Sequence, residues 1–280
     1  MPRWTDPHLR AERHGADIAA AWTLLLSAMN FSFWQDEPRW RVSGHDGYLA
    51  LVHALRRAFD AGWPVGDPEH YATWSVDDLA TVLRGDVGGA PVPPLLAERH
   101  AVAADVGRWL CDVHRGSALA ALGAAASAAE FAQILAATLP RFRDVADWRG
   151  MRVAFLKRAQ IAAHDCGAAL GESAPAGLRD RSDLTAFADY KVPQMLRAEG
   201  VLVYAPALAE TVDSRTEIAA GSSQEVEIRA LTVVAVDQLA SGLRARGTGC
   251  DAPLVDGWLW WRGQEGRDMA PYHRTRTIWY

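Results

Sequence analysis

Apolar residues recur at helical spacing along nearly the whole chain, and no other feature of the sequence limits the fold as strongly. In residues 17–29 they form one broad stripe, and in residues 48–61 they lie on one face that ends at Gly62. Side chains three and four positions apart share one face of an α-helix. Only residues 200–205 offer a short β-type run, and no alternating set of strands accompanies it. The pattern therefore predicts an all-α fold, or nearly so.

Serine residues with an acid three positions later mark three helix starts. In such a capping box the serine accepts a backbone amide and the acid reaches back to the amide of the serine. The pairs are Ser75 with Asp78, Ser127 with Glu130, and Ser222 with Glu225. We expect the helix after Ser222 to carry Ile228, Leu231, Ala235 and Leu239 on one face. Two further helices are predicted at residues 95–114 and 153–169.

The chain of 280 residues shows no long linker and no low-complexity stretch. Half of its residues are hydrophobic and 12 are tryptophan, which is enough for a large core and an aromatic pocket. We predict one compact helical domain over residues 1–280, with the Gly-Pro-rich residues 85–94 as the candidate hinge between two lobes. Cys111, Cys166 and Cys250 are far apart and odd in number, which favours reduced thiols.

A formal net charge of −5 and a pI near 6.0 argue against binding to long nucleic acid, because such affinity comes from clustered Lys and Arg. Binding of a single phosphate group is compatible with this charge. No apolar run approaches the roughly 18 residues that a membrane span needs, and the polar N-terminus does not resemble a signal peptide. These features predict a cytoplasmic protein without membrane contact.

Residues 185–197 contain a proline that interrupts a helical pattern. Pro193 has no amide hydrogen, and its ring clashes with the carbonyl four residues earlier, which belongs to Asp189. A continuous helix through both residues would cost about 3 kcal/mol or more, and Val192 is expected to be extended. The sequence therefore predicts a break between Asp189 and Pro193, with Pro193 in the first turn of a helix that ends near Gly200.

Asp189 at this break has neighbours suited to glycosidic chemistry, because Phe187, Tyr190 and Lys191 lie beside it in the sequence. Aromatic surfaces hold a flat base, and a carboxylate stabilises the positive charge that develops on a sugar as its bond to the base breaks. The alternative is that Asp189 only caps the helix while Phe187 belongs to the core, since aspartate is a favoured cap.

The eight residues 187–194 (FADYKVPQ) resemble the signature of the queuosine salvage protein family, and five further motifs follow the order of that family. They are residues 30–34 (NFSFW), 155–161 (FLKRAQI), 225–229 (EVEIR), 256–260 (DGWLW) and 271–280 (PYHRTRTIWY). The resemblance spans almost the whole chain. It implies a helical N-glycosidase, with a core similar to that of some DNA glycosylases, which releases queuine from the free nucleotide queuosine 5′-monophosphate without a metal or other cofactor.

The resemblance also implies roles for individual residues. Asp189 corresponds to the catalytic carboxylate, acting as nucleophile, stabiliser of the sugar cation or activator of water, and Phe187 corresponds to the residue that stacks on the deazapurine. Lys157 matches the lysine of its motif, and we assign it to the 5′-phosphate. Without the family, a solvated position on an amphipathic helix explains Lys157 equally well.

Asp256 stands directly before Gly257 and the tryptophan-rich residues 258–261. Queuine carries a cationic aminomethyl arm, so an acid in an aromatic wall suits it, and Trp260 offers a stacking or cation–π face. The alternative is that Asp256 is the N-cap of a core helix. Some relatives carry an acid where this chain has Trp261, which is a departure in the region of base recognition.

His273 and Arg274, near the C-terminus, are further candidates for binding the substrate. Because guanidinium groups suit phosphate, these residues could help Lys157 to hold the 5′-phosphate. Alternatively, they pair with acidic residues of the 225–229 motif or with the terminal carboxylate and anchor the tail.

Asn30 and Trp34 are candidate site residues at the end of the first long helix. They lie four positions apart, so that they share a face on a continuous helix through residues 17–34. Trp34 is equally a candidate for the core, and Asn30 for the end of the helix.

Two other functions fit parts of the sequence. A His-Asp pair on a helix, here His164-Asp165, is a signature of metal-dependent phosphohydrolases, although such a site needs further His and Asp ligands from other helices. A carrier that binds queuine or its nucleotide without cleaving it is the non-enzymatic alternative. Treatment with EDTA separates the phosphohydrolase from the glycosidase, and substitution of Asp189 separates the carrier from it.

Overall fold

The structure of the protein is a computed structural model that describes residues 7–265 and 269–280. Residues 1–6 and 266–268, which belong to the predicted domain range 1–280, lie outside the described residues. The interpretation of the polar N-terminus rests in part on residues 1–6 and also falls outside them. Within the described residues, the helices are α1 (Ala11–His14), α2 (Ala16–Ala28), α3 (Gly47–Asp60), α4 (Pro68–Tyr71), α5 (Val76–Val82), α6 (Leu96–His114), α7 (Ala118–Gly123), α8 (Ala128–Thr138), α9 (Lys157–Leu170), α10 (Lys191–Ala198), α11 (Pro206–Asp213), α12 (Ser223–Ala245) and α13 (Ala252–Arg262). The only sheet in this part of the chain pairs β1 (Val145–Trp148) with β2 (Met151–Ala154). The prediction of a nearly all-α fold is confirmed.

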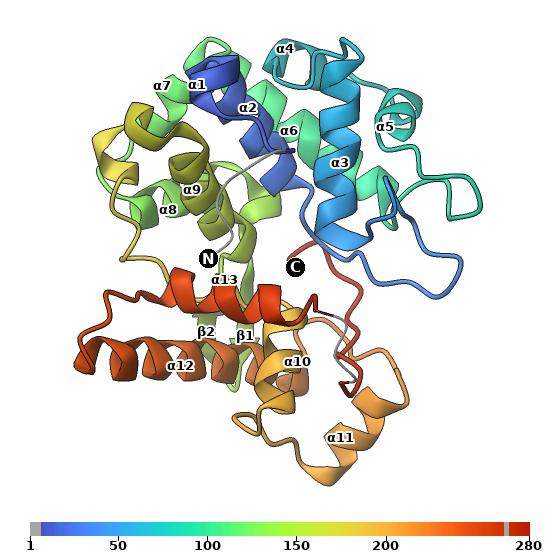
Figure 1. The fold of residues 1–280 in the computed structure, drawn as a ribbon, viewed down its shortest axis with the longest axis vertical. Helices are drawn as coiled ribbons and strands as arrows, with labels where there is room; N and C mark the ends of the chain where they lie inside the picture. Colours follow the sequence, from blue (N-terminus) through green and yellow to red (C-terminus); the bar gives the residue numbers. More distant parts are fainter. Residues whose placement is uncertain (1–6, 266–268) are drawn as a thin grey trace.

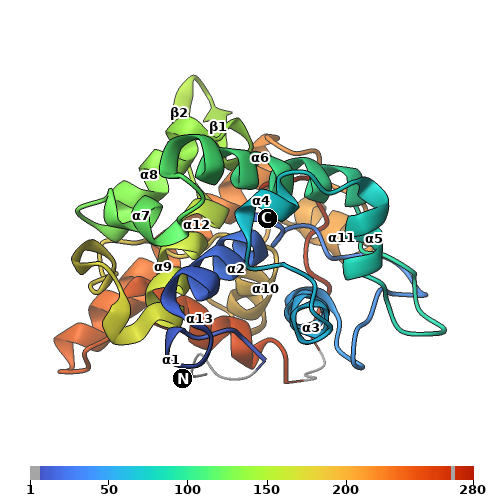
Figure 2. The same cartoon turned by 90° about the horizontal axis from the view of Figure 1, so that it is seen from above.

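The helices form two groups, which Figure 1 shows above and below its centre. Helices α1 to α9 make the upper group, where α2 packs against α9 and the largest core cluster lies. Helices α10, α12 and α13 make most of the lower group and share a second core cluster, and α13 packs along α12. Figure 2 shows the same groups from above. The last residues of the chain run back to the centre of the molecule, between the two groups.

The predicted hinge at residues 85–94 is a loop between α5 and α6, within the upper group. It is tied to a neighbouring segment, because the amide of Asp86 binds the carbonyl of Arg41 and the amide of Ala90 binds the carbonyl of Arg39. The division between the two core clusters falls near residue 185 instead. One domain with a hinge at residues 85–94 stays a prediction.

A β-hairpin replaces the start of one predicted helix. The helix expected at residues 153–169 begins at Lys157, because Val153 and Ala154 belong to β2. Arg149 and Gly150 both have positive φ, 51° and 81°, which is the geometry of a two-residue hairpin turn of type I′. This turn folds β2 back on β1 before the helix starts.

The β-type run at residues 200–205 forms no strand. The amides of Val201 and Leu202 bind the carbonyl of Leu196, and Gly200 has a φ of 73°. A left-handed glycine followed by amides that return to the last turn closes a helix C-terminus. The prediction of a strand here was wrong because the chain uses these residues to end α10.

Side-chain caps confirm all three predicted helix starts. Ser75, Ser127 and Ser222 each accept the backbone amide three residues later. Only α5 has the complete capping box, in which the carboxylate of Asp78 also binds the amide of Ser75. In the other two helices the acid binds the amide one residue before the serine.

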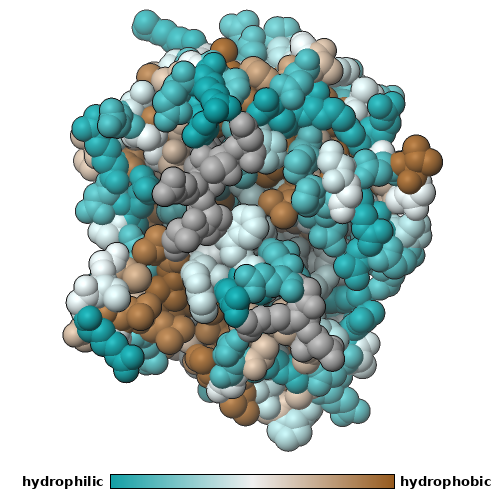
Figure 3. Space-filling view, viewed as in Figure 1, coloured by the Kyte–Doolittle hydropathy of each residue, from teal (hydrophilic) through white to brown (hydrophobic). Residues whose placement is uncertain are grey.

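The face of α12 that packs into the protein differs from the predicted one. Ile228 and Ala235 are buried, but Leu231 and Leu239 are exposed. Arg229 takes a buried position on this helix instead. Figure 3 shows an apolar surface at its lower left, where Figure 1 places α12 and α13. The prediction failed because it assumed that a buried face holds apolar residues only.

None of the helices in the described ranges is long and apolar enough to cross a membrane.

The three cysteines form no disulfide bond, and only Cys166 is buried.

Candidate active site

The predicted break at Asp189 is present. Helix α10 begins two residues later, at Lys191, and Pro193 is its third residue. Asp189 Oδ1 accepts the backbone amides of Lys191 at 2.8 Å and Val192 at 2.9 Å. Val192 is helical, so the expectation that it is extended was wrong. Because the carboxylate binds its amide, Val192 is held in the first turn, where the missing N–H of Pro193 would have had no partner within the helix.

Two pockets meet at this break. The apolar pocket, of about 200 Å³, is lined by His8, Asn30, Tyr48, Lys157, Ile161, His164, Asp165, Phe187, Asp189, Pro253, Leu254, Asp256, Gly257, Trp260 and Trp261. The polar pocket, of about 70 Å³, is lined by residues 30–35, Arg39, Trp40, residues 46–49, Lys157, residues 189–191, Trp260, Gln264, Tyr272 and Tyr280. The residues common to both are Asn30, Tyr48, Lys157, Asp189 and Trp260. Asp189 and Lys157 therefore lie at the junction of an apolar and a polar chamber.

Opposite charges face each other at this junction. Asp189 is 8% exposed, and burial raises the pKa of its carboxyl, while Lys157 and the two bound amides lower it. Lys157 is 4% exposed and donates from Nζ to the carbonyl of Asn30 at 2.9 Å. Burial lowers the pKa of Lys157 to about 8, against the opposing influence of Asp189. The alternative of a solvated position for Lys157 was wrong.

Asp256 lies within the apolar pocket, in the middle of α13. The N-cap of that helix is Asp251, so the alternative of Asp256 as an N-cap was wrong. Asp256 Oδ1 accepts the amide of Phe187 at 3.0 Å, and this bond fixes the chain two residues before Asp189. Burial, and then the charge of Asp189, raise the pKa of Asp256 well above its usual range.

Aromatic rings form the walls around these carboxylates. The ring of Phe187 meets the ring of His164 edge-on, with 5.5 Å between centroids. Trp260 lines both pockets, and Tyr190 lines the polar one. Lys191 also lines the polar pocket, where its Nζ lies 5.1 Å from the centre of the Tyr272 ring.

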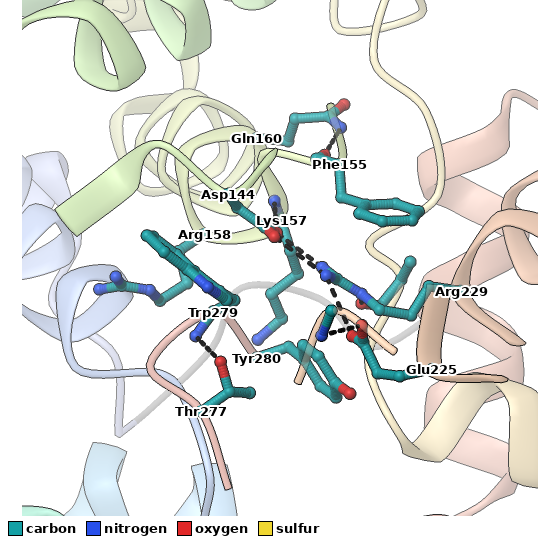
Figure 4. Close-up of polar contacts among 12 residues, drawn as sticks. Asp144, Phe155, Lys157, Arg158, Gln160, Glu225, Arg229, Thr277, Trp279 and Tyr280 are labelled. Carbon is teal, nitrogen blue, oxygen red and sulfur yellow. Dashed lines mark hydrogen bonds and ion pairs between the residues drawn. The ribbon is translucent and has the colours of Figure 1, made fainter. Parts of the chain in front are cut away.

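A buried ion pair holds the two sides of the junction together. Arg229 donates from Nη1 and Nη2 to the carboxylate of Asp144 at 2.9 and 2.6 Å, and from Nε to the carbonyl of Ala188 at 3.1 Å. Asp144 Oδ2 also accepts the amide of Lys157 at 3.1 Å. Figure 4 shows Arg229 reaching Asp144 beside the side chain of Lys157, with Glu225 on the other side of Arg229. One side chain thus connects the residue before Asp189 with the start of the helix that carries Lys157.

Sequence reasoning missed the part played by Arg229 and Asp144. The residues 225–229 stood out only as a matched motif, and nothing near Asp144 marks it as polar core. The two residues lie 85 positions apart, so no local pattern could pair them. Tyr48, Arg39 and Asp165 are further pocket residues that were not predicted as substrate-binding.

Two predicted site residues lie outside both pockets. Arg274 pairs with Asp36 at 2.9 Å, and His273 is buried and lies 3.3 Å from the hydroxyl of Tyr280 through its Nε2. Neither makes the predicted pairing with the acids of the 225–229 motif. The structure does not bring them to Lys157, although Tyr280 itself lines the polar pocket.

Asn30 and Trp34 both line the polar pocket, but not on a common helix face. Helix α2 ends at Ala28, and Ser32 has a φ of 39°, so the predicted helix through residue 34 was wrong. The indole of Trp34 donates to the carbonyl of Thr275 at 3.2 Å. The C-terminal segment therefore holds this tryptophan in place after the helix has ended.

His164 and Asp165 face the apolar pocket, with 3.0 Å between Nδ1 and Oδ1. No group of three or more His, Cys, Asp or Glu side chains suited to a metal is found among residues 7–265 and 269–280. A metal site needs ligands that converge from several elements.

The fold and the site define a class of mostly helical proteins that hold a buried carboxylate between aromatic walls, at the start of an interrupted helix. A family model described as queuosine salvage protein matches residues 9–280. This chain belongs to the queuosine salvage protein family.

Relatives from distant organisms match over most of their length, and each is named queuosine 5′-phosphate N-glycosylase/hydrolase. The relative from Sphaerobacter thermophilus is 43% identical over 285 residues, covering 99% of this chain and 87% of the relative. The relative from Mus musculus is 33% identical over 298 residues, with 100% and 87% covered. The relative from Schizosaccharomyces pombe is 29% identical over 294 residues, with 92% and 82% covered.

Proposed function

We propose that this protein hydrolyses the N-glycosidic bond of queuosine 5′-monophosphate to release queuine for salvage, with Asp189 as the catalytic carboxylate. The observation that carries the proposal is the place of Asp189 and Lys157, at the junction of an apolar and a polar chamber. A nucleotide has the same division, because its flat base is joined at one bond to a polar sugar phosphate. The names of the relatives support the same reaction.

In this arrangement the base enters the apolar pocket, where Phe187 and Trp260 offer stacking surfaces. The ribose then lies at the junction, with its anomeric carbon beside Asp189. As the bond from C1′ to N9 breaks, its electron pair leaves with the base and positive charge develops on the sugar. The carboxylate of Asp189 stabilises this charge and takes a proton from the water that adds to C1′. The base takes up one proton as it leaves, which the proton released by water replaces, so the products are queuine and ribose 5-phosphate.

The 5′-phosphate belongs in the polar pocket, against Lys191. The ammonium group of Lys191 lies over the Tyr272 ring, and no carboxylate within the described ranges forms an ion pair with it. A cation without a carboxylate partner is suited to a phosphate. Lys157, which the family resemblance assigned to the phosphate, is buried at the junction of the two pockets. It therefore lies on the sugar side of the phosphate and adds a second positive charge there.

We expect Lys191→Met to raise KM for queuosine 5′-monophosphate by about 10- to 100-fold and to leave kcat much less affected, because a charge-assisted hydrogen bond contributes about 1.5–3 kcal/mol. The KM for the nucleoside queuosine, which has no phosphate, should change little. Steady-state release of queuine from both substrates measures the effect.

Arg274→Met is the matched control, since Arg274 lies outside both pockets and pairs with Asp36. Its KM for the nucleotide should equal that of the unaltered protein. A large increase in KM with Arg274→Met but not with Lys191→Met would move the phosphate site to the C-terminal segment.

The cationic arm of the base requires an ionised acid in the apolar pocket. Of the three carboxylates that line it, Asp189 and Asp256 are buried beside Lys157, whereas Asp165 has a side chain that is 14% exposed and lies next to His164. The sequence assigned the arm to Asp256. We propose Asp165 for this role instead, because it lines the same pocket and its carboxylate contacts His164, whereas backbone amides hold the carboxylates of Asp189 and Asp256.

Incubation with queuosine 5′-monophosphate and mass detection of free queuine tests the function directly. Release should continue in the presence of EDTA. Loss of release with EDTA, restored by a divalent metal, would favour a phosphohydrolase that uses His164 and Asp165. Tight binding of the nucleotide without release, at every pH tried, would favour a carrier.

A further inference from the structure

The apolar pocket contains two buried carboxylates whose surroundings differ. Asp189 and Asp256 both line it, and each is less than 10% exposed. Two carboxylates in one buried site do not both ionise easily, so one of them tends to keep its proton. Which one keeps it decides which is the acid and which is the base.

The hydrogen bonds favour the charge on Asp189. Its Oδ1 accepts two amides at the N-terminus of α10, where the helix dipole also stabilises a negative charge. Asp256 lies in the middle of α13 and accepts a single amide, from Phe187. Burial and the charge of Asp189 raise the pKa of Asp256 well above its usual range, and the Phe187 amide and Lys157 offset this only in part. The proton therefore rests on Asp256.

Asp256 has an oxygen free to use that proton. Its Oδ1 holds the Phe187 amide, and within the described residues no hydrogen bond reaches Oδ2. A protonated carboxyl group donates one hydrogen bond, and here the donor faces the pocket that we assign to the base.

The leaving base of the proposed reaction needs such a donor. In ordinary purine nucleotides, protonation of N7 makes the base a better leaving group. Queuine is a 7-deazaguanine with carbon at that position, so it cannot be activated there. Its pyrimidine-ring nitrogen N3, separated from N9 by one carbon atom, is the nearest basic atom to the bond that breaks.

We propose that Asp256 is the general acid of the reaction, which transfers its proton from Oδ2 to N3 of the departing base as the C1′–N9 bond breaks. This inference rests on the proposed function. The electron pair of the broken bond stays on the base, which is released as a neutral tautomer. Water adds to C1′ and gives a proton to Asp189. Passage of that proton to Asp256, directly or through solvent, restores the starting state, so that atoms and charges balance.

Other titratable groups share the pocket and shape its pH dependence. They are His8, Tyr48, Lys157, His164, Asp165 and Asp189. Lys157, with a pKa of about 8, loses its charge on the alkaline side, and Asp256 is among the charges that raise this pKa. Comparison of two proteins that differ only at residue 256 therefore reports on Asp256 together with its influence on Lys157.

Asp256→Asn tests the proposal. An asparagine still accepts the Phe187 amide and presents an N–H where the acid has its O–H, but it transfers no proton. We expect kcat for queuosine 5′-monophosphate to fall by about 10²- to 10³-fold, as for other general acids. Affinity for queuine, measured by calorimetry, should stay within about threefold, because the hydrogen-bonding pattern is preserved.

The pH profile supplies a readout that a structural role would not move. The acid acts only while protonated, so its contribution is full below the pKa of Asp256 and is lost as the pH rises through it. The ratio of wild-type to Asp256→Asn kcat should therefore be largest at low pH and shrink at alkaline pH. Asp251→Asn, at the N-cap of the same helix and outside both pockets, should leave the profile unchanged.

The outcomes separate this inference from the proposed function. If the wild-type protein releases no queuine, the proposed function fails. If it does, and Asp256→Asn keeps kcat within about threefold or shows a ratio independent of pH, the general-acid role is overturned. A loss of queuine affinity of about tenfold or more with unchanged kcat would assign Asp256 to the cationic arm.

Discussion

Asp189→Asn should lower kcat for queuine release by about 10³- to 10⁴-fold, since it removes both the charge that stabilises the sugar cation and the group that accepts the proton of water. The asparagine oxygen can still accept the amides of Lys191 and Val192, so α10 should keep its cap. Affinity for queuine should be retained, because the walls of the apolar pocket stay in place. Mass detection of queuine together with calorimetric binding measures both quantities.

Asp67→Asn is a matched control for this substitution. Asp67 caps α4 by accepting the amide of Glu69, and it lines neither pocket. Its activity should equal that of the unaltered protein. Release of queuine at the wild-type rate by Asp189→Asn, with binding intact, would remove Asp189 from the chemistry.

Arg229→Met should have the largest effect on stability of any substitution considered. It leaves the carboxylate of Asp144 buried without its partner, and breaking a buried ion pair from one side costs about 3–5 kcal/mol of unfolding free energy. It also releases the carbonyl of Ala188 beside Asp189, so activity should fall in the fraction that stays folded. Urea unfolding followed by circular dichroism measures the free energy.

The double variant Asp144→Asn with Arg229→Met separates the ion pair from simple loss of packing. Because it removes the charge of Asp144 together with that of Arg229, only Glu225 loses its partner, and the destabilisation should be clearly smaller than the sum of the two single effects. Asp213→Asn, which removes the exposed partner of Arg197, should barely move the unfolding midpoint. Strictly additive effects of the two buried substitutions would contradict the coupling that the distances imply.

Local chemistry was enough to predict most of the fold. Helices at residues 17–29, 48–61 and 95–114 follow from the spacing of apolar residues, and three serine caps mark helix starts, because these signals act within one or two turns. The same locality explains the errors. A type I′ turn at Arg149 and Gly150 converted the start of a predicted helix into a hairpin, and the run after Gly200 ended a helix instead of forming a strand.

The break at Asp189 was determined by the sequence itself, since Pro193 cannot continue a helix through that residue. Only the tertiary structure decided what surrounds it. The amide of Phe187 binds Asp256, 69 positions away, and Asp144 joins Arg229 across 85 positions. It also decided that Lys157 is buried and that Arg274 pairs away from both pockets. A proline acts on its neighbours through covalent geometry, whereas the burial and charge of a side chain depend on which distant segments the folded core brings together.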